Sequence, residues 1–518
     1  MLNSQKIKEL WTNLQEEHFK GKWAILIPMS IGAILCIYYA ANGNIPLAAT
    51  ICIIPFVLMF LGLFIHKPVL LFSILFIVNY GIMGVSRYIS IPLPISVLMD
   101  ALMISTLLAL CIALIRNRTT FKQEVIPFIL LYGVWVVFCL IQVFNNTAGM
   151  GFEFMTTPWF KEVRPLAFHA LYIILIFTLL FTRNKHIKYF LYFWGIAIIL
   201  AAIKGYIQRN QGFDPYEMRW LMSGGARTHF IHSGIRYFSF YSDAANYGSN
   251  MAFSLVVYAI CFLYEKNKFD RICWLIIALA AGYGLMISGT RTALIVAISG
   301  FVLYTLLSKN IKLFLVSCSF LIISVGILKF TTWGDGNQFI RRMRTAFDPE
   351  DASLQVRLIN QKAIKAYMKE APWGIGIGIG MGADQLPTNN KYWMVSITPS
   401  DSSLVYVWMR TGAIGVSLYL LVLGLAIIAE CYIVLFRIKD KQLRGILTAF
   451  TCGSACMIVA AYGNNIYTQY PNTLLVFGLQ TLVFMGPYFD RQITEEKEKE
   501  QKALEEKDEI RPAQEKET

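Results

Sequence analysis

The chain has 518 residues, of which 56% are hydrophobic and only 15% are charged, and its formal net charge is +14. A soluble domain carries nearer a quarter of charged residues, so the composition excludes an ordinary water-soluble fold and indicates a lipid bilayer as the solvent. The positive charge does not identify a nucleic-acid partner, because membrane proteins concentrate Lys and Arg in their cytoplasmic loops.

The apolar blocks predict helices, because they run for about twenty residues without alternation between apolar and polar positions. A helix also satisfies its own backbone hydrogen bonds in hydrocarbon. Residues 1–22 are charged, too hydrophilic for a secretion signal and not followed by a small-residue cleavage site, so we expect a cytoplasmic N-terminal segment. The apolar stretches then lie at 23–42, 45–65, 69–86, 96–115, 126–144, 166–182, 190–207, 245–264, 272–288, 292–307, 313–329, 403–436, 446–463 and 472–489. The predicted fold class is an all-α, polytopic membrane protein with roughly 12–14 transmembrane helices.

Basic residues mark alternate connections between these stretches. They are Arg116, Arg118 and Lys122; Arg183, Lys185 and Lys188; Lys266, Lys268 and Arg271; Lys309 and Lys312; and Arg437, Lys439, Lys441 and Arg444. The positive-inside rule makes this side cytoplasmic and places both termini there. The domain plan is therefore a bundle over 23–329 with an outward loop at 209–243, a large outward loop at 330–401, further membrane helices over 402–489, and a charged cytoplasmic tail over 490–518 that is a frayed helix or disordered.

The larger outward loop has a pattern of its own. Ser353 is a candidate cap for an amphipathic surface helix that Pro372 ends, and a glycine repeat follows from Gly374 to Gly382, where absent side chains permit close backbone approach. All ten cysteines fall in apolar blocks, so we expect no disulfide framework.

Arginines are unusually frequent in the outward loops, where orientation rules predict few. They are Arg209, Arg219, Arg227, Arg236, Arg341, Arg342, Arg344 and Arg357, with Arg291 at a tight outer turn. Each could pair with a nearby carboxylate. As a set they favour diphosphate binding, because guanidinium groups match phosphate oxygens bidentately. Arg291 is the sharpest candidate, since an ionisable group at the membrane surface indicates a functional site unless it snorkels to lipid phosphate.

Two further features have competing interpretations. His229 and His232 could hold a metal, but spacing alone supplies no third ligand, so polar contacts or support for the arginines are the alternatives. Asp401 precedes an apolar span and could cap that helix, serve as general base for a hydroxyl, or do both. Asp243 is similar, with capping the stronger interpretation.

The order of these motifs resembles that of the O-antigen ligase and O-antigen polymerase family of bacterial envelope glycosyltransferases. The resemblance covers about residues 190–435. The segments that carry it are Arg236 followed by Asp243-Ala-Ala-Asn246, Ser288-Gly-Thr-Arg291, Arg357 before Pro372-Trp-Gly-Ile-Gly376, and Asp401-Ser-Ser-Leu404 running to Arg410-Thr-Gly412.

The resemblance implies a function at the periplasmic face of the bacterial cytoplasmic (inner) membrane. A sugar hydroxyl would attack the anomeric carbon of a polyprenyl-diphosphate-linked glycan, with a glycan or lipid-linked acceptor and with no cofactor, metal or nucleic acid. Arg291 and Asp401 would be catalytic, and Arg236, Arg227, Arg357 and His232 would bind substrate. The chain departs from the family where Asp401 replaces the histidine proposed to activate the acceptor, and where Arg410 replaces a frequent acidic residue.

Two other classes stay open. One is a transporter or flippase for a lipid-linked glycan or small anion, although no internal repeat between the halves is evident. The other is a purely structural membrane protein. The sequence does not separate polymerase from ligase, nor identify the sugar.

Overall fold

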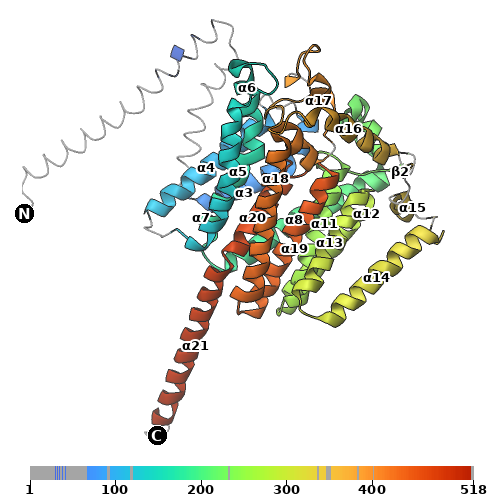
Figure 1. Ribbon diagram of the computed structural model, residues 1–518. Coiled ribbons are helices and arrows are strands. Elements are labelled where there is room, and N and C mark those ends of the chain that lie inside the picture. Colours follow the sequence, from blue (N-terminus) through green and yellow to red (C-terminus); the bar gives the residue numbers. More distant parts are fainter. Residues whose placement is uncertain are drawn as a thin grey trace, which may run out of the picture.

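The computed structural model describes residues 67–89, 94–116, 121–231, 234–334, 338–345, 352–381, 384–400 and 402–514, with a few single positions between 30 and 41 and at 336 and 350. Across these residues the fold is a bundle of long helices, and its strands are the two-residue β1 (Phe230–Ile231) and β2 (Gly234–Ile235) (Figure 1). The expected all-α, polytopic fold class is confirmed.

The long helices follow the predicted apolar stretches closely. They are α3 (Pro68–Tyr88), α4 (Ile95–Arg116), α5 (Ile126–Ile141), α7 (His169–Leu180), α8 (Lys185–Gln211), α11 (Ala244–Tyr264), α12 (Lys268–Ile287), α13 (Arg291–Leu307), α14 (Ile311–Phe330), α18 (Ser403–Tyr432), α19 (Lys441–Gly463), α20 (Asn472–Phe484) and α21 (Gly486–Gln514). Shorter helices are α6 (Phe152–Val163), α9 (Pro215–Trp220), α10 (Ala226–His229), α15 (Gln338–Arg344), α16 (Ala352–Met368) and α17 (Trp393–Ile397).

Nine continuous helical segments among the described residues are long and apolar enough to cross a membrane, or ten if the bent α20–α21 pair is one span. One of the nine joins α6 to α7 through a π-helical segment, and α13 falls just short of the required length. The expected spans at 23–42 and 45–65 lie outside the described residues or include only single described positions. The central helices are α11 and α19, which pack on each other and are the most buried of the spans.

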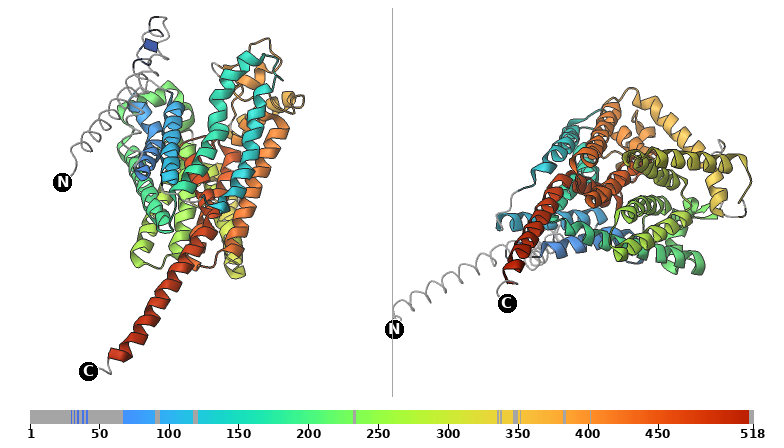
Figure 2. Two further views of the ribbon diagram at one scale, coloured as in Figure 1. Left: turned by 90° about the vertical axis from the view of Figure 1, so that its left-hand side faces the viewer. Right: turned by 90° about the horizontal axis from the view of Figure 1, so that it is seen from below.

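The basic connections gather at the end of the bundle from which α21 departs (Figures 1 and 2). Lys122 donates to the carbonyl of Thr178 over 2.7 Å there, and Lys497 of α21 pairs with Asp440 over 2.7 Å. The tail is helical up to Gln514, where the sequence had left a frayed helix or disorder open. The short helices α15, α16 and α17 lie at the opposite end, as expected for the outward loops.

A break in α18 accommodates the glycine repeat. Gly412 has φ 70°, which interrupts the helix and leaves the carbonyls of Met409 and Arg410 to accept from the amides of Ile375 and Gly376 over 3.0 and 3.1 Å. The glycine loop thus replaces the missing helical hydrogen bonds, which matters because unpaired backbone groups are costly near hydrocarbon.

Candidate caps were predicted at the starts of three helices. Ser402 supplies the side-chain cap of α18, because its hydroxyl accepts from the amides of Leu404 and Val405 over 3.1 and 3.3 Å, and Asp401 lies outside the described residues. The helix α16 begins at Ala352, one residue before Ser353. The prediction for Asp243 is confirmed, since its carboxylate accepts from the first amides of α11.

Candidate functional site: an arginine-lined cavity

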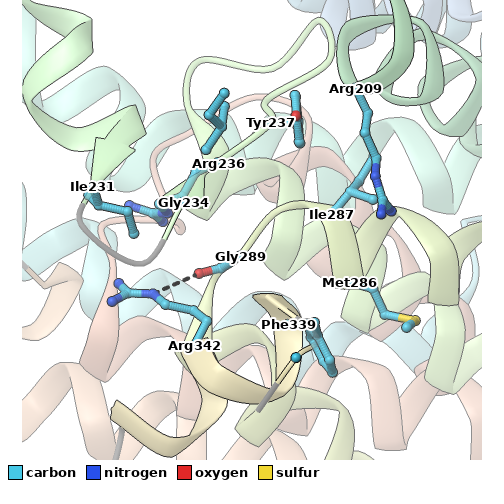
Figure 3. A pocket seen from close by; sticks show the side chains of 12 residues that line it. Arg209, Ile231, Gly234, Arg236, Tyr237, Met286, Ile287, Gly289, Phe339 and Arg342 are labelled. Carbon is cyan, nitrogen blue, oxygen red and sulfur yellow. Dashed lines mark hydrogen bonds between the residues drawn. The ribbon is translucent and has the colours of Figure 1, made fainter. Parts of the chain in front are cut away.

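A cavity of about 390 Å³ lies at the end of the bundle opposite the basic connections. It is enclosed by the end of α8, the β1–β2 hairpin, the α12–α13 turn and α15 (Figure 3). Its lining residues are Arg209, Ile231, Gly234, Ile235, Arg236, Tyr237, Met286, Ile287, Gly289, Gly336, Phe339 and Arg342. Segments separated by more than a hundred residues therefore converge on one small space.

The turn between α12 and α13 forms the floor of this cavity. Gly289 has φ +57°, and a Cβ atom there would lie 3.2 Å from Cγ of Arg236, so glycine suits both the backbone conformation and the approach of the arginine. The carbonyl of Gly289 accepts from Nε of Arg342 over 3.3 Å, the bond drawn in Figure 3. The Ser288–Arg291 motif thus shapes a turn that two arginines approach.

Arg236 is held against this turn by hydrogen bonds. Its Nη1 donates to the carbonyl of Thr228 over 3.1 Å, and its Nη2 donates to the hydroxyl of Thr290 over 3.0 Å. Burial lowers the pKa of Arg236, and the neighbouring charges of Arg291 and Arg357 lower it further, whereas Asp243 raises it. Two other arginines that the sequence singled out, Arg291 and Arg357, are therefore close enough to repel Arg236.

Arg291 opens α13 and contacts the large loop. Its Nη1 donates to the carbonyl of Thr345 over 2.7 Å and to the hydroxyl of Thr345 over 3.1 Å. Arg291 is half-buried beside the cavity and is not one of its lining residues. The contact ties α13 to the end of α15, which carries Arg342.

The cavity combines positive charge with apolar surface. Among the described residues, its three lining arginines are accompanied by no lining Asp or Glu, so their field attracts anions. Ile235 and Met286 are 38% and 47% exposed and add an apolar margin. An amphiphilic anion, with a compact charged group joined to an apolar chain, matches both properties.

The other predicted site residues take different places. Arg227 is exposed on α10 and does not line the cavity, whereas Arg357 lies on α16 near enough to act on Arg236. His232 and Asp401 lie outside the described residues. Arg209 and Arg342 line the cavity, but the sequence analysis named them only as members of the arginine set. Their position in the outward loops was the signal in the sequence that could have identified them as site residues.

His229 has a structural role. Nδ1 of its ring contacts the carbonyl of Gly225 at 2.8 Å, and its Nε2 accepts from the amide of Ala244 over 3.2 Å. Burial lowers the pKa of His229, which favours the neutral ring that these two bonds require. Across the described residues, no three His, Cys, Asp or Glu side chains come together in a way that could hold a metal ion.

The start of α18 is joined to the start of α13. The carbonyl of Asn464 accepts from the amide of Ser403 over 3.2 Å, and the side-chain amide of Asn464 donates to the hydroxyl of Thr292 over 2.8 Å. Asn464 therefore connects the residue that follows the α18 cap with the residue that follows Arg291.

Arg410 has an acidic partner from another helix. It is buried, its guanidinium carbon lies 3.6 Å from the ring centre of Tyr406, and its Nη2 lies 3.8 Å from Oε2 of Glu162 on α6. Tyr406 also donates to Glu162. The carboxylate of Glu162 thus lies beside Arg410. The sequence analysis did not identify Glu162, because no motif surrounds it in the chain.

The bundle and the cationic cavity define a multi-pass membrane protein with a charged site at one end of its helices. Residues 274–420 match the O-antigen ligase family, and this segment includes Arg291, Arg342 and Arg357. The match confirms the resemblance over this segment and supports an O-antigen ligase-type membrane protein of glycan processing. Among curated proteins, none matches the chain.

Proposed function

We propose that the protein is an envelope glycan transferase, an O-antigen polymerase or ligase, whose arginine-lined cavity binds the diphosphate of a polyprenyl-linked glycan at the outer face of the bacterial cytoplasmic membrane. The observation that carries the proposal is the cavity with three arginines, an apolar margin and no carboxylate among its described lining residues, formed in part by the family-matching segment. Its size of about 390 Å³ suits a small charged group.

In this reaction the acceptor hydroxyl attacks the anomeric carbon of the donor sugar. The bond from that carbon to the diphosphate oxygen breaks, and the electron pair leaves with the lipid diphosphate. Arg236, Arg342 and Arg209 stabilise the charge that develops on the leaving group, and Arg291 and Arg357 add to the local field. The hydroxyl proton passes to a carboxylate, for which we propose Asp401.

The position of Asp401 in the chain supports this assignment. The residues that follow it, Ser402 and Ser403, are anchored at the start of α18, and Asn464 joins Ser403 to Thr292 beside Arg291. The side chain of Asn464 would therefore connect a base on this segment to the α12–α13 turn, around which the arginines lie.

The first test measures glycan formation in a deletion strain, with membrane abundance measured in parallel. Arg342→Lys keeps the charge but loses the bidentate geometry. Arg291→Ala removes a charge-assisted interaction worth about 1.5–3 kcal/mol. In each variant, turnover should fall by roughly ten- to a hundredfold. Arg271→Lys, at the start of α12, is the matched control and should leave turnover unchanged. Full glycan production by Arg291→Ala and Arg342→Lys would retire the diphosphate site and move the transporter hypothesis ahead.

The second test separates the base from a structural role of the carboxylate. Asp401→Asn keeps the size of the side chain and its hydrogen-bonding oxygen but removes proton acceptance, so we expect normal abundance with turnover lowered by about 10²–10⁴-fold. Because Ser402 supplies the observed cap, Asp401→Asn should not weaken the start of α18. Wild-type turnover in this variant would exclude Asp401 as the base.

A further inference from the structure

A carboxylate lies buried in the membrane-spanning part of the bundle, far from the arginine-lined cavity. Glu430 is fully buried on α18, seven residues before Arg437, which places it roughly 10 Å from the basic end of the helix. Neither of its carboxylate oxygens has a hydrogen bond of good geometry, and the groups of the described chain that act on it, Gln480 and Thr451, are uncharged. A buried charge without a partner is strongly unfavourable, so Glu430 requires neutralisation.

Polar side chains from two neighbouring helices surround this carboxylate. Gln480 of α20 and Thr451 of α19 adjoin it, and both are fully buried. The amide of Gln480 and the hydroxyl of Thr451 also lack hydrogen-bonding geometry with any described partner. The hydroxyl of Ser454, one helical turn from Thr451 on the same helix, is buried and unpartnered as well. Four unpartnered polar side chains in one helical core are unusual, because buried polar groups are normally satisfied.

We propose that Glu430, Gln480, Thr451 and Ser454 form an intramembrane binding site for one monovalent cation, a sodium ion or a proton. The available ligand atoms are a carboxylate, an amide carbonyl and two hydroxyls, which are hard oxygen donors suited to an alkali cation. A single positive charge balances the single carboxylate, whereas a divalent ion would leave a net charge in the membrane. A proton on Glu430 gives the same neutrality, with the acid donating to the Gln480 carbonyl.

The surroundings restrict which groups can change charge. The titratable side chains that face Glu430 are Cys431 of its own helix, Cys452 of α19 and Tyr467 of the α19–α20 connection. Thiols and phenols are neutral in weakly acidic solution, so Glu430 is the group of this set that responds there. The site joins α18, α19 and α20, so its occupancy should appear as stability of their packing, and this inference does not depend on the proposed transferase function.

The experiment measures thermal unfolding of the purified full-length protein in detergent. At about pH 8, sodium chloride is titrated against choline chloride and potassium chloride at constant ionic strength, and a pH series between about pH 5 and pH 9 is run in choline chloride. For a sodium site, we expect a saturable rise in the melting temperature with sodium that Glu430→Gln abolishes and that Thr451→Val shifts to severalfold higher concentration. Glu370→Gln, an exposed carboxylate paired with Lys391, is the control and should respond like the wild type.

For a proton site, sodium has no specific effect, the wild-type melting temperature falls as the pH rises, and Glu430→Gln removes that dependence. An infrared band of a protonated carboxylic acid that is absent in Glu430→Gln supports this outcome independently. If Glu430→Gln does not accumulate, Thr451→Val and Ser454→Ala take its place in the sodium titration, and the wild-type infrared band decides for the proton. A wild-type melting temperature that responds to neither sodium nor pH, or responses that survive in these variants, would overturn the site.

Discussion

Gly374 offers the sharpest test of how the large outward loop is attached to the bundle. The residue has φ +82°, and a methyl group on it would overlap the backbone of Arg410 and Thr411 at the break in α18. Because the obstructing atoms belong to the main chain, no side-chain rotation relieves the overlap. In Gly374→Ala the loop must therefore retreat from α18.

The cost can be worked out from the contacts that the retreat breaks. A non-glycine residue in the left-handed region costs about 1–2 kcal/mol. The amides of Ile375 and Gly376 would lose their bonds to the carbonyls of Met409 and Arg410, each worth about 0.5–1.5 kcal/mol. The variant should lose about 2–5 kcal/mol of stability.

Thermal unfolding in detergent, followed by the loss of the monodisperse peak in size-exclusion chromatography, measures this effect. Gly424→Ala is the matched control, because Gly424 lies in α18, the helix that the glycine loop contacts, and a methyl group there meets nothing within 4 Å. The control should be neutral or more stable by about 0.5–1 kcal/mol, as alanine favours helix. Equal melting temperatures for the two variants would contradict the proposed contact between the glycine loop and the helix break.

Two further predictions concern orientation and the start of α11. An alkaline phosphatase fusion at Asn389 should be active and one at Arg118 inactive, because the basic connections alternate in that register; activity at Arg118, or none at Asn389, would reverse the topology. Asp243→Ala should destabilise the protein by about 1 kcal/mol in a thermal unfolding assay, because Oδ1 of Asp243 accepts from the amides of Ala245 and Asn246 over 2.8 and 2.9 Å, whereas Asp243→Asn should retain most of that stability. Equal losses in both variants would show that the charge of Asp243, and not its cap, is what matters.

The sequence by itself determined the bundle. A helix that crosses a bilayer needs about twenty apolar residues and satisfies its own backbone, so the long uncharged blocks predict the positions of the helices with little help from long-range contacts. The basic connections and the arginine-rich loops follow the same local logic. The resemblance was also recognisable, because the motifs occur in order along the chain and the match at residues 274–420 includes three of them entirely.

The tertiary structure decided which of the many arginines share a site. Arg209, Arg236 and Arg342 come from three segments of the chain, and only the packing of α8, the hairpin and α15 around the Gly289 turn brings them to one cavity. The structure also identified Ser402 as a cap of α18, because capping depends on backbone geometry at one residue, which composition does not encode. The pairing of Arg410 with Glu162 and the gathering of Gln480 and Thr451 around Glu430 were likewise invisible in sequence, since side chains from different helices meet only when the helices pack.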